Sequence, residues 1–215
     1  DGLPAGSDGA LGRMFLQGEK NLFPDTMKVR QAFDAARAFY PEFDRSLAEE
    51  LARRFGLNPK QKITNLSTGY GSVFQLILGL SVNTPYLLLD EPVLGLDARH
   101  RDLFYKTLLR CYADRPRTVV ISTHLISEAA DIVEHTVIIR EGRILRDTPT
   151  EELTADACTV SGPAALLDDY LAGRTVLSES AVGGLKTACV QGEESGPLPA
   201  GLERRRINLQ DYFIS

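Results

Sequence analysis

The chain has 215 residues, of which 43% are apolar and 25% charged, and its formal net charge is −5. This length and composition suffice for one domain with a full core and a smaller appendage. The acidic balance argues against a nucleic-acid-binding protein, which would carry a basic surplus, so we expect no nucleic-acid partner. The three cysteines form no metal or redox motif, and no apolar run is long enough to cross a bilayer.

The first part of the chain predicts a strand followed by two helices. Residues 13–16 form a short apolar strand, and Gln17 begins a polar loop. From Met27 apolar side chains recur at helical spacing up to residue 40. Asp44 is expected to cap a second helix that ends at Gly56, because glycine is common just beyond a helix C-terminus. Together they predict a small helical insert.

A glycine-containing helix start follows at residues 66–72. Ser67 is a suitable N-cap residue, and Gly69 and Gly71 would let an anion approach the free backbone amides of the first turn. Such a helix start attracts anions, because unpaired N–H groups and the positive end of the helix dipole point the same way. Serine and glycine also begin many helices that bind nothing.

The centre of the chain is an apolar run at residues 86–89 that ends in two acids. An uninterrupted run of this kind is typical of a strand buried on both faces of a parallel sheet. Asp90 and Glu91 follow, and Pro92 ends the strand. In an open α/β sheet, ligands bind at the carboxyl edge of the strands, which predicts a functional site here. Two acids at a strand end can also simply be solvated.

A second buried strand is expected at residues 118–122, after a helix at 98–113 that Asp97 would cap. This strand ends at Thr123 and His124. His124 would then be one of four polar side chains at the same edge of the sheet. These are Gln17, Asp90, Glu91 and His124. Such a constellation is typical of a catalytic site. His100 and His135 lack this placement, and we assign them no role.

Beyond residue 134 the sequence predicts a hairpin around Glu141 and Gly142, and a short helix at 151–153. From residue 155 it predicts short strands with one helix at 164–171 and a helix-like end at 209–213. We therefore expect a core at residues 1–154, with a helical subdomain at about 26–80, and a small α+β accessory region at 155–215.

Five of these segments, taken in order, resemble motifs of the nucleotide-binding subunit of an ABC transporter. They are Gln17 of the Q-loop, the signature variant LSTGY at 66–70, the Walker B segment LLLDEP at 87–92, the D-loop GLD at 95–97 and the switch segment STH at 122–124. Together they are specific, although no single one is. The resemblance implies a P-loop NTPase-like α/β fold with a parallel sheet core, a helical insert, and bound ATP and Mg²⁺.

The resemblance also implies roles for the residues at the sheet edge. Asp90 would hold Mg²⁺ through its water shell, and Gln17 would contact the same ion. Glu91 would act as the general base toward the attacking water. His124 would hydrogen-bond the γ-phosphate and stabilise the charge that develops there.

The signature and the D-loop imply a dimer. Ser67, Thr68 and Gly69 would contact ATP held by a second ATPase subunit, identical or different, and Asp97 would link the two sites. A transmembrane permease subunit would dock on the helical insert. The resemblance therefore implies an ATPase that powers transport from the cytoplasmic side, peripheral on the inner face of the cell membrane.

The chain departs from the family pattern in two ways. Thr68 replaces a usual glycine and Tyr70 the usual glutamine of the signature. No G-x-x-x-x-G-K-S/T phosphate loop occurs, and the chain begins at Asp1. We therefore expect an N-terminal Walker A portion to be missing, the chain alone to bind MgATP poorly and be inactive, and the strand beside residues 86–89 to be absent, leaving a sheet prone to association.

Two other functions remain open. A degenerate or regulatory subunit could donate only its signature to an active partner, but it would not need Glu91 and His124. A soluble ABC ATPase without a transport role is a further alternative. The short insert lacks the long coiled coil of the DNA-repair members, and the single acidic unit lacks the paired domains and basic linkers of those that act on ribosomes.

Overall fold

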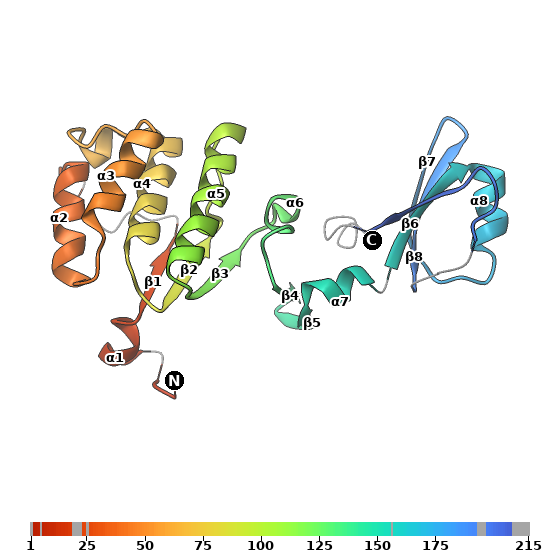
Figure 1. Ribbon diagram of the computed structural model, residues 1–215, viewed down its shortest axis with the longest axis horizontal. Coiled ribbons are helices and arrows are strands. Elements are labelled where there is room, and N and C mark those ends of the chain that lie inside the picture. The colour runs from red at the N-terminus through yellow and green to blue at the C-terminus, as the bar shows by residue number, and fades with distance from the viewer. Residues whose placement is uncertain are drawn as a thin grey trace. The chain divides into compact units, whose positions relative to one another are not determined.

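The chain folds into two compact units, Asp1–His124 and Leu125–Ser215. The computed structural model, drawn in Figure 1, describes residues 2–4, 6–18, 23–24, 26–155, 157–192 and 197–207. Both units mix helices with strands. The boundary that the sequence suggests between an ATPase core and an accessory region, at residues 154 and 155, stays a prediction.

Unit 1 is built on a parallel sheet of β1 (Met14–Gln17), β2 (Tyr86–Asp90) and β3 (Thr118–Ser122) in the order β1-β2-β3. The three strands lie in register, so that Leu16, Leu88 and Val120 form one row across the sheet. This arrangement confirms the expected α/β architecture with parallel strands. The expectation that a strand beside residues 86–89 would be absent is wrong, because β2 is paired on both sides.

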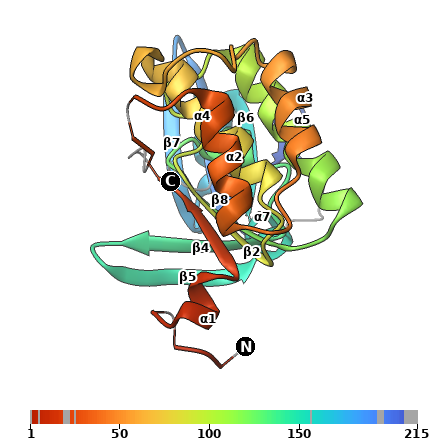
Figure 2. The same ribbon diagram turned by 90° about the vertical axis from the view of Figure 1, so that its left-hand side faces the viewer.

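The helices of unit 1 gather on one side of this sheet, as Figures 1 and 2 show. They are α2 (Val29–Phe39), α3 (Arg45–Arg54), α4 (Thr68–Ser81) and α5 (Ala98–Asp114), with a 3-10 turn at Ile63–Asn65. A short α1 (Asp8–Leu11), which the sequence did not predict, precedes β1 and lies apart from these helices (Figure 1). Asp44 caps α3 as expected, accepting from the Leu47 amide at 2.9 Å, and Gly56 follows that helix with a φ of +71°. α4 packs closely on the sheet, since a Cβ at Gly79 would lie 3.4 Å from Leu87.

The strands are buried on one face only, which corrects the prediction of strands buried on both faces. Leu87 and Leu89 are buried under the helices, whereas Leu16 is 60% and Val120 49% exposed. The chain moves across the sheet in one direction from β1 to β2 to β3. Right-handed crossovers then place the connecting helices on the same face. Among the described residues of unit 1, nothing covers the opposite face.

Unit 2 contains two antiparallel sheets. The first is the predicted hairpin of β4 (His135–Arg140) and β5 (Arg143–Pro149), whose turn has φ values of +51° at Glu141 and +73° at Gly142. The second has the order β7-β8-β6-β9. Its strands are β6 (Ala157–Pro163), β7 (Val176–Val182), β8 (Leu185–Gln191) and β9 (Glu203–Arg206), and the unit's helices are α6 (Ile126–Ala129), α7 (Thr150–Ala155) and α8 (Ala164–Leu171).

The core of this second sheet lies between its strands and α8, where Val160, Leu167 and Val190 are buried. The sequence did not predict β9, and the helix-like segment at 209–213 lies outside the described residues. None of the helices that the structure describes has both the length and the apolar character needed to cross a membrane.

Candidate functional site

The carboxyl edge of the β1–β3 sheet brings together the polar residues that the sequence singled out. Gln17 ends β1 opposite Leu89, and Asp90 ends β2 opposite Ser122. The Gln17 side chain is only 4% exposed, and its Oε1 atom has no hydrogen-bond partner among the described residues. Asp90, by contrast, is exposed. A buried acceptor thus lies beside an accessible carboxylate.

A cavity of about 470 Å³ opens at this edge. Gln17, Asp90 and Glu91 line it from the sheet, and Ser67 and Thr68 line it from the start of α4. The three sheet residues are predicted to act on one nucleotide, and the two residues of α4 on the nucleotide of a second subunit. Both groups nevertheless line the same cavity in this chain. Three other predicted residues, Gly69, Asp97 and His124, are not among its lining residues.

Glu91 occupies a turn that aims its side chain at the end of β3. Its φ of +45° lies in the left-handed region, which costs a non-glycine residue about 1–2 kcal/mol. The turn is held by a hydrogen bond from the Glu91 amide to the Ser122 carbonyl at 2.8 Å. The carboxylate accepts from the Thr123 hydroxyl at 3.2 Å and from the His124 amide at 3.0 Å, and His124 Nδ1 lies 2.8 Å from Oε1.

This contact determines which nitrogen of His124 carries a proton. A carboxylate only accepts hydrogen bonds, so Nδ1 must be the donor toward Glu91. Nε2 is then left to face another group, and the His124 side chain is 63% exposed. The convergence of Glu91 and His124 that the sequence suggested is therefore a direct contact. Thr123 joins them, which the sequence could have indicated only through its place beside His124.

The start of α4 is shaped by its contact with the turn before α5. Ser67 is the N-cap, and its Oγ accepts from the Tyr70 amide at 3.3 Å. A Cβ at Gly69 would lie 3.1 Å from the Gly95 carbonyl oxygen, so this glycine permits close packing. At Gly71 a Cβ would meet nothing within 4 Å, and this residue lines the cavity. Gly71 is thus the position that leaves room for a ligand.

Asp97 caps α5 as predicted, and it is held by a residue to which the sequence assigned no role. Its Oδ1 accepts from the His100 amide at 2.8 Å, and its Oδ2 lies 3.0 Å from His100 Nδ1. The hydrogen bond from this backbone N–H lowers the pKa of the Asp97 carboxyl below its ordinary value. The three-residue spacing between an N-cap aspartate and a polar side chain is a signal that could have identified His100.

The donor set at the cavity fits a magnesium ion better than a transition metal. In the part of the chain that the structure describes, no group of three or more His, Cys, Asp or Glu side chains is placed to hold a metal. Mg²⁺ usually keeps several waters and binds proteins through one or two oxygen ligands. The unpartnered Gln17 Oε1 and the exposed Asp90 carboxylate offer oxygens of this kind at one cavity.

Comparisons with known proteins agree with the motifs. The chain is 31% identical over 109 residues to the ABC transporter ATP-binding protein YtrB of Bacillus subtilis (strain 168), which covers 51% of this chain and 37% of YtrB. It is 27% identical over 152 residues to the energy-coupling factor transporter ATP-binding protein EcfA2 of Ligilactobacillus salivarius (strain UCC118), covering 68% and 52% of the two chains. No protein-family model matches the chain.

A solved structure described as the ATP-binding subunit of an ABC transporter shares the fold. Its TM-score is 0.61 at 18% identity, covering 69% of this chain and 63% of the other. The chain therefore has the mixed α/β fold of such ATP-binding subunits. More narrowly, it is homologous to the ATP-binding proteins of ABC transporters over 51% to 68% of its length, which confirms the resemblance seen in the motifs. The chain spans between 37% and 52% of the length of these two relatives.

Proposed function

We propose that this chain supplies the catalytic sheet edge and the signature segment of an ATP-hydrolysing subunit that powers an ABC transporter. The observation that carries the proposal is the Glu91 carboxylate, which is hydrogen-bonded to His124 and Thr123 next to a cavity lined by Gln17 and Asp90. A degenerate subunit that only donates its signature would have no use for this paired carboxylate and imidazole.

In the proposed mechanism each residue at the edge has a separate task. Gln17 and Asp90 would hold Mg²⁺, which offsets the negative charge of the phosphates when bound. Glu91 would orient a water and accept its proton as general base. Because Glu91 accepts from Nδ1 of His124, the Nε2 atom would be presented to an oxygen of the γ-phosphate, where it stabilises developing charge.

The signature segment would act on a nucleotide held by a second subunit, identical or different. Ser67, Thr68 and Gly69 would meet its γ-phosphate at the start of α4, where the helix dipole favours an anion. Asp97 would connect the two sites across the interface. The exposure of Ser67 and Thr68 supports this role, because both side chains are open to a partner.

Phosphate binding is the part of the reaction for which the 215 residues contain no recognisable motif. We expect the chain by itself to bind MgATP weakly and to hydrolyse little, since a phosphate loop normally cradles the β- and γ-phosphates. Calorimetric titration with MgATP, applied to this chain and to an N-terminally extended version, tests this expectation. Tight binding by the chain alone would mean that another of its segments holds the phosphates.

The test of the catalytic assignment is Glu91→Gln in a version that hydrolyses ATP. Glutamine can keep the acceptor toward His124 and offer its amide to the Thr123 hydroxyl, so the fold should survive. Loss of the base is expected to lower turnover by about 10²–10⁴-fold while MgATP still binds. Unchanged turnover would remove Glu91 from the mechanism.

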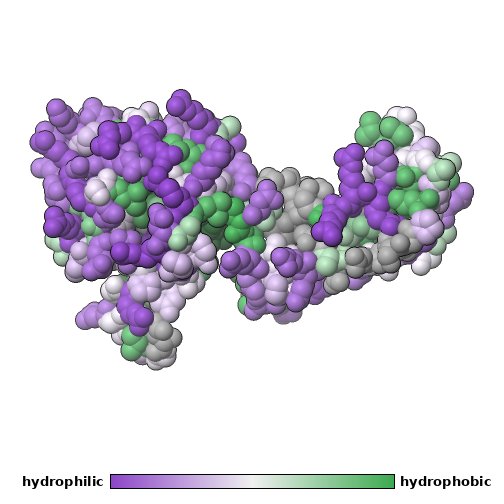
Figure 3. Space-filling view, in the orientation of Figure 1, coloured by the Kyte–Doolittle hydropathy of each residue, from purple (hydrophilic) through white to green (hydrophobic). Residues whose placement is uncertain are grey.

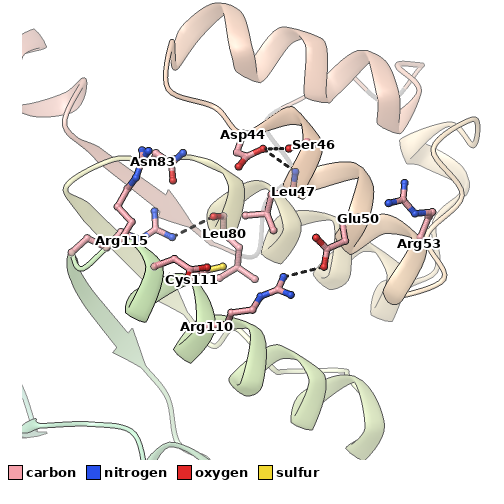
Figure 4. A pocket seen from close by; sticks show the side chains of 12 residues that line it. Asp44, Ser46, Leu47, Glu50, Arg53, Leu80, Asn83, Arg110, Cys111 and Arg115 are labelled. Carbon is pink, nitrogen blue, oxygen red and sulfur yellow. Dashed lines mark hydrogen bonds and ion pairs between the residues drawn. The ribbon is translucent and has the colours of Figure 1, made fainter.

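The membrane partner is proposed to dock near the helical insert. Within the insert, Phe33 is fully buried in the core, whereas Phe39 is 80% exposed. Beside the insert a hollow of about 620 Å³ lies between α3 and α5 (Figure 4). Its charged lining residues are Asp44, Glu50, Arg53, Arg110, Asp114, Arg115 and Arg117.

Polar contacts would guide docking at this hollow, because the surface over α2, α3 and α5 is mostly hydrophilic in Figure 3. Arg110 is engaged by Glu50 at 3.1 Å, whereas Arg53 forms no ion pair within the described residues. We propose that Arg53 meets an acidic side chain on a cytoplasmic segment of a permease. The subunit would then sit in the cytoplasm, peripheral on the inner face of the membrane. Arg53→Glu should reduce co-purification with that permease, whereas Arg143→Glu in unit 2 should not.

A soluble ABC ATPase without a transport role is the second candidate function. It differs from the first in needing no membrane partner. Copurification of the intact protein with ribosomes or DNA, and with no membrane protein, would favour it. Retention in the membrane fraction that is lost with Arg53→Glu would favour the transporter subunit.

A further inference from the structure

The imidazole of His100 lies where three helix ends meet. On one side its Nδ1 atom is 3.0 Å from Oδ2 of Asp97, at the start of α5. On the other side its Nε2 atom is 3.3 Å from the carbonyl oxygen of Phe55, the C-cap residue of α3. The Phe55 ring stacks on the imidazole at 5.8 Å and 14°, and Tyr70 from the first turn of α4 meets it edge-on at 6.3 Å.

Both ring nitrogens of His100 face atoms that can only accept hydrogen bonds. A carboxylate and a main-chain carbonyl have no proton to donate. A ring with a proton on each nitrogen therefore donates to both acceptors, whereas a neutral ring donates to only one. The titratable groups against the ring are the Asp97 carboxylate and the Tyr70 phenol.

Tyr70 fits here because of the residue that follows α3. Gly56 has a φ of +71°, and a Cβ at that position would lie 3.4 Å from the Tyr70 hydroxyl. The Tyr70 side chain is therefore used within the chain, over the end of α3 and the edge of His100. This contact gives a physical reason for tyrosine where the family's signature has glutamine.

The turn before Asp97 is tied to α4 by two further contacts. The Ser72 hydroxyl lies 3.2 Å from the carbonyl oxygen of Leu94. Gly69 and Gly95 pack so closely that a Cβ on the former would lie 3.1 Å from the latter's oxygen. His100 closes this network through α3, so the starts of α4 and α5 are held together from two sides.

We propose that His100 is a positioning residue that directs the Asp97 carboxylate and, through Phe55 and Tyr70, holds the D-loop against the signature segment. The proposal rests on the proposed function in one respect: Asp97 and Ser67 have to act at a shared nucleotide interface. His100 itself touches no nucleotide. Its loss leaves the groups of the catalytic edge in place and lets the two interface segments move independently.

The first test uses this chain without nucleotide. It contains three histidines, whose ring nitrogens can be resolved by long-range ¹⁵N–¹H NMR at pH 6 after assignment by single substitutions. We expect the His100 Nδ1 proton, which faces Asp97 Oδ2, to exchange slowly with water, and Asp97→Asn to abolish this slow exchange. A His100 ring that exchanges freely, or does not respond to Asp97→Asn, would overturn the proposal.

The second test uses the protein in its assembled, ATP-hydrolysing form. His100→Phe keeps the aromatic contacts and removes both donors, whereas His100→Gln restores one donor toward Asp97. We expect His100→Phe to lower kcat about tenfold with KM for MgATP unchanged, as misplacement of an interface group does, and His100→Gln to recover at least half of the loss.

The matched control is His135→Phe, at a ring whose Nε2 atom lies 2.6 Å from Oδ1 of Asp147 in the hairpin of unit 2. It should leave kcat within twofold. Equal effects of the two phenylalanine variants, or a kcat for His100→Phe within twofold of the parent, would refute the positioning role. If the parent protein hydrolyses no ATP, the proposed function fails, while the NMR experiment still decides whether His100 bridges Asp97 and Phe55.

Discussion

Replacing Glu91 by alanine and by glycine should separate the strain of its turn from the hydrogen bonds of its side chain. Both variants lose the same acceptors toward Thr123 and His124, and they differ only in the Cβ atom at a φ of +45°. A left-handed conformation costs a residue with a Cβ about 1–2 kcal/mol. Glycine in turn lowers the free energy of unfolding by about 0.5–1 kcal/mol relative to alanine, because it has more conformational freedom to lose on folding. The Glu91→Gly variant should therefore be the more stable of the two by about 0.75 kcal/mol, the difference between the mid-range values of these two effects.

Urea unfolding followed by circular dichroism measures this difference. With an m-value of about 1–3 kcal/mol per molar urea, the midpoints should differ by a few tenths molar. The control is Glu49 within α3, where Glu49→Gly should be less stable than Glu49→Ala by about 1 kcal/mol. The sign of the alanine–glycine difference thus inverts between the sites. The same sign at both would refute the assignment of a left-handed turn that aims Glu91 at His124.

Three further predictions concern the elements that support the site. Gly69→Ala should lower the free energy of unfolding by about 1–2 kcal/mol, since its Cβ would press on a main-chain oxygen. At Gly71 the added Cβ faces open space, so Gly71→Ala should be neutral or raise the free energy of unfolding by up to about 1 kcal/mol in the same assay. The hydrogen bond from the Leu47 amide, in the first turn of α3, lowers the pKa of the Asp44 carboxyl below its ordinary value of 3.8. The ionised Asp44 carboxylate therefore stabilises the fold above pH 3.8, and this stabilisation is lost as the pH falls through the pKa of the folded state. Asp44→Asn, which keeps the cap, should flatten the fall of melting temperature between about pH 4 and pH 2. Arg117 donates to three carbonyls at the end of α4, so Arg117→Met should lower the free energy of unfolding by about 1–3 kcal/mol, with partial recovery in Arg117→Lys.

Several elements could be predicted from the sequence because their signals are local. Asp44, Ser67 and Asp97 were recognised as N-caps, since a short polar side chain before an amphipathic run can satisfy the first free amides. β3 and α8 fall on the expected residues. β9 was missed because four consecutive charged residues, Glu203–Arg206, show no alternation of apolar and polar side chains, and they form a strand only by pairing with β6.

The prediction that the strands are buried on both faces was wrong because burial, like the pairing of β9, depends on other segments of the chain. An apolar run shows that a strand can be covered on both faces, but coverage depends on which elements the chain places there. Leu16 and Val120 remain largely exposed because both crossovers carry their helices to the other face. The pairing of β2 with strands on both sides was likewise a matter of topology.

For the candidate site, the sequence by itself determined which residues are candidates for the chemistry: the acids after a buried strand, the glutamine and histidine at neighbouring strand ends, and the capped helix start. These follow from residue types and their spacing along the chain. Only the tertiary structure decided that Glu91 holds His124 through Nδ1, that Gly69 serves packing while Gly71 faces the cavity, and that His100 binds Asp97. Each of these depends on a turn or a contact between segments far apart in the sequence, whose geometry no local pattern encodes.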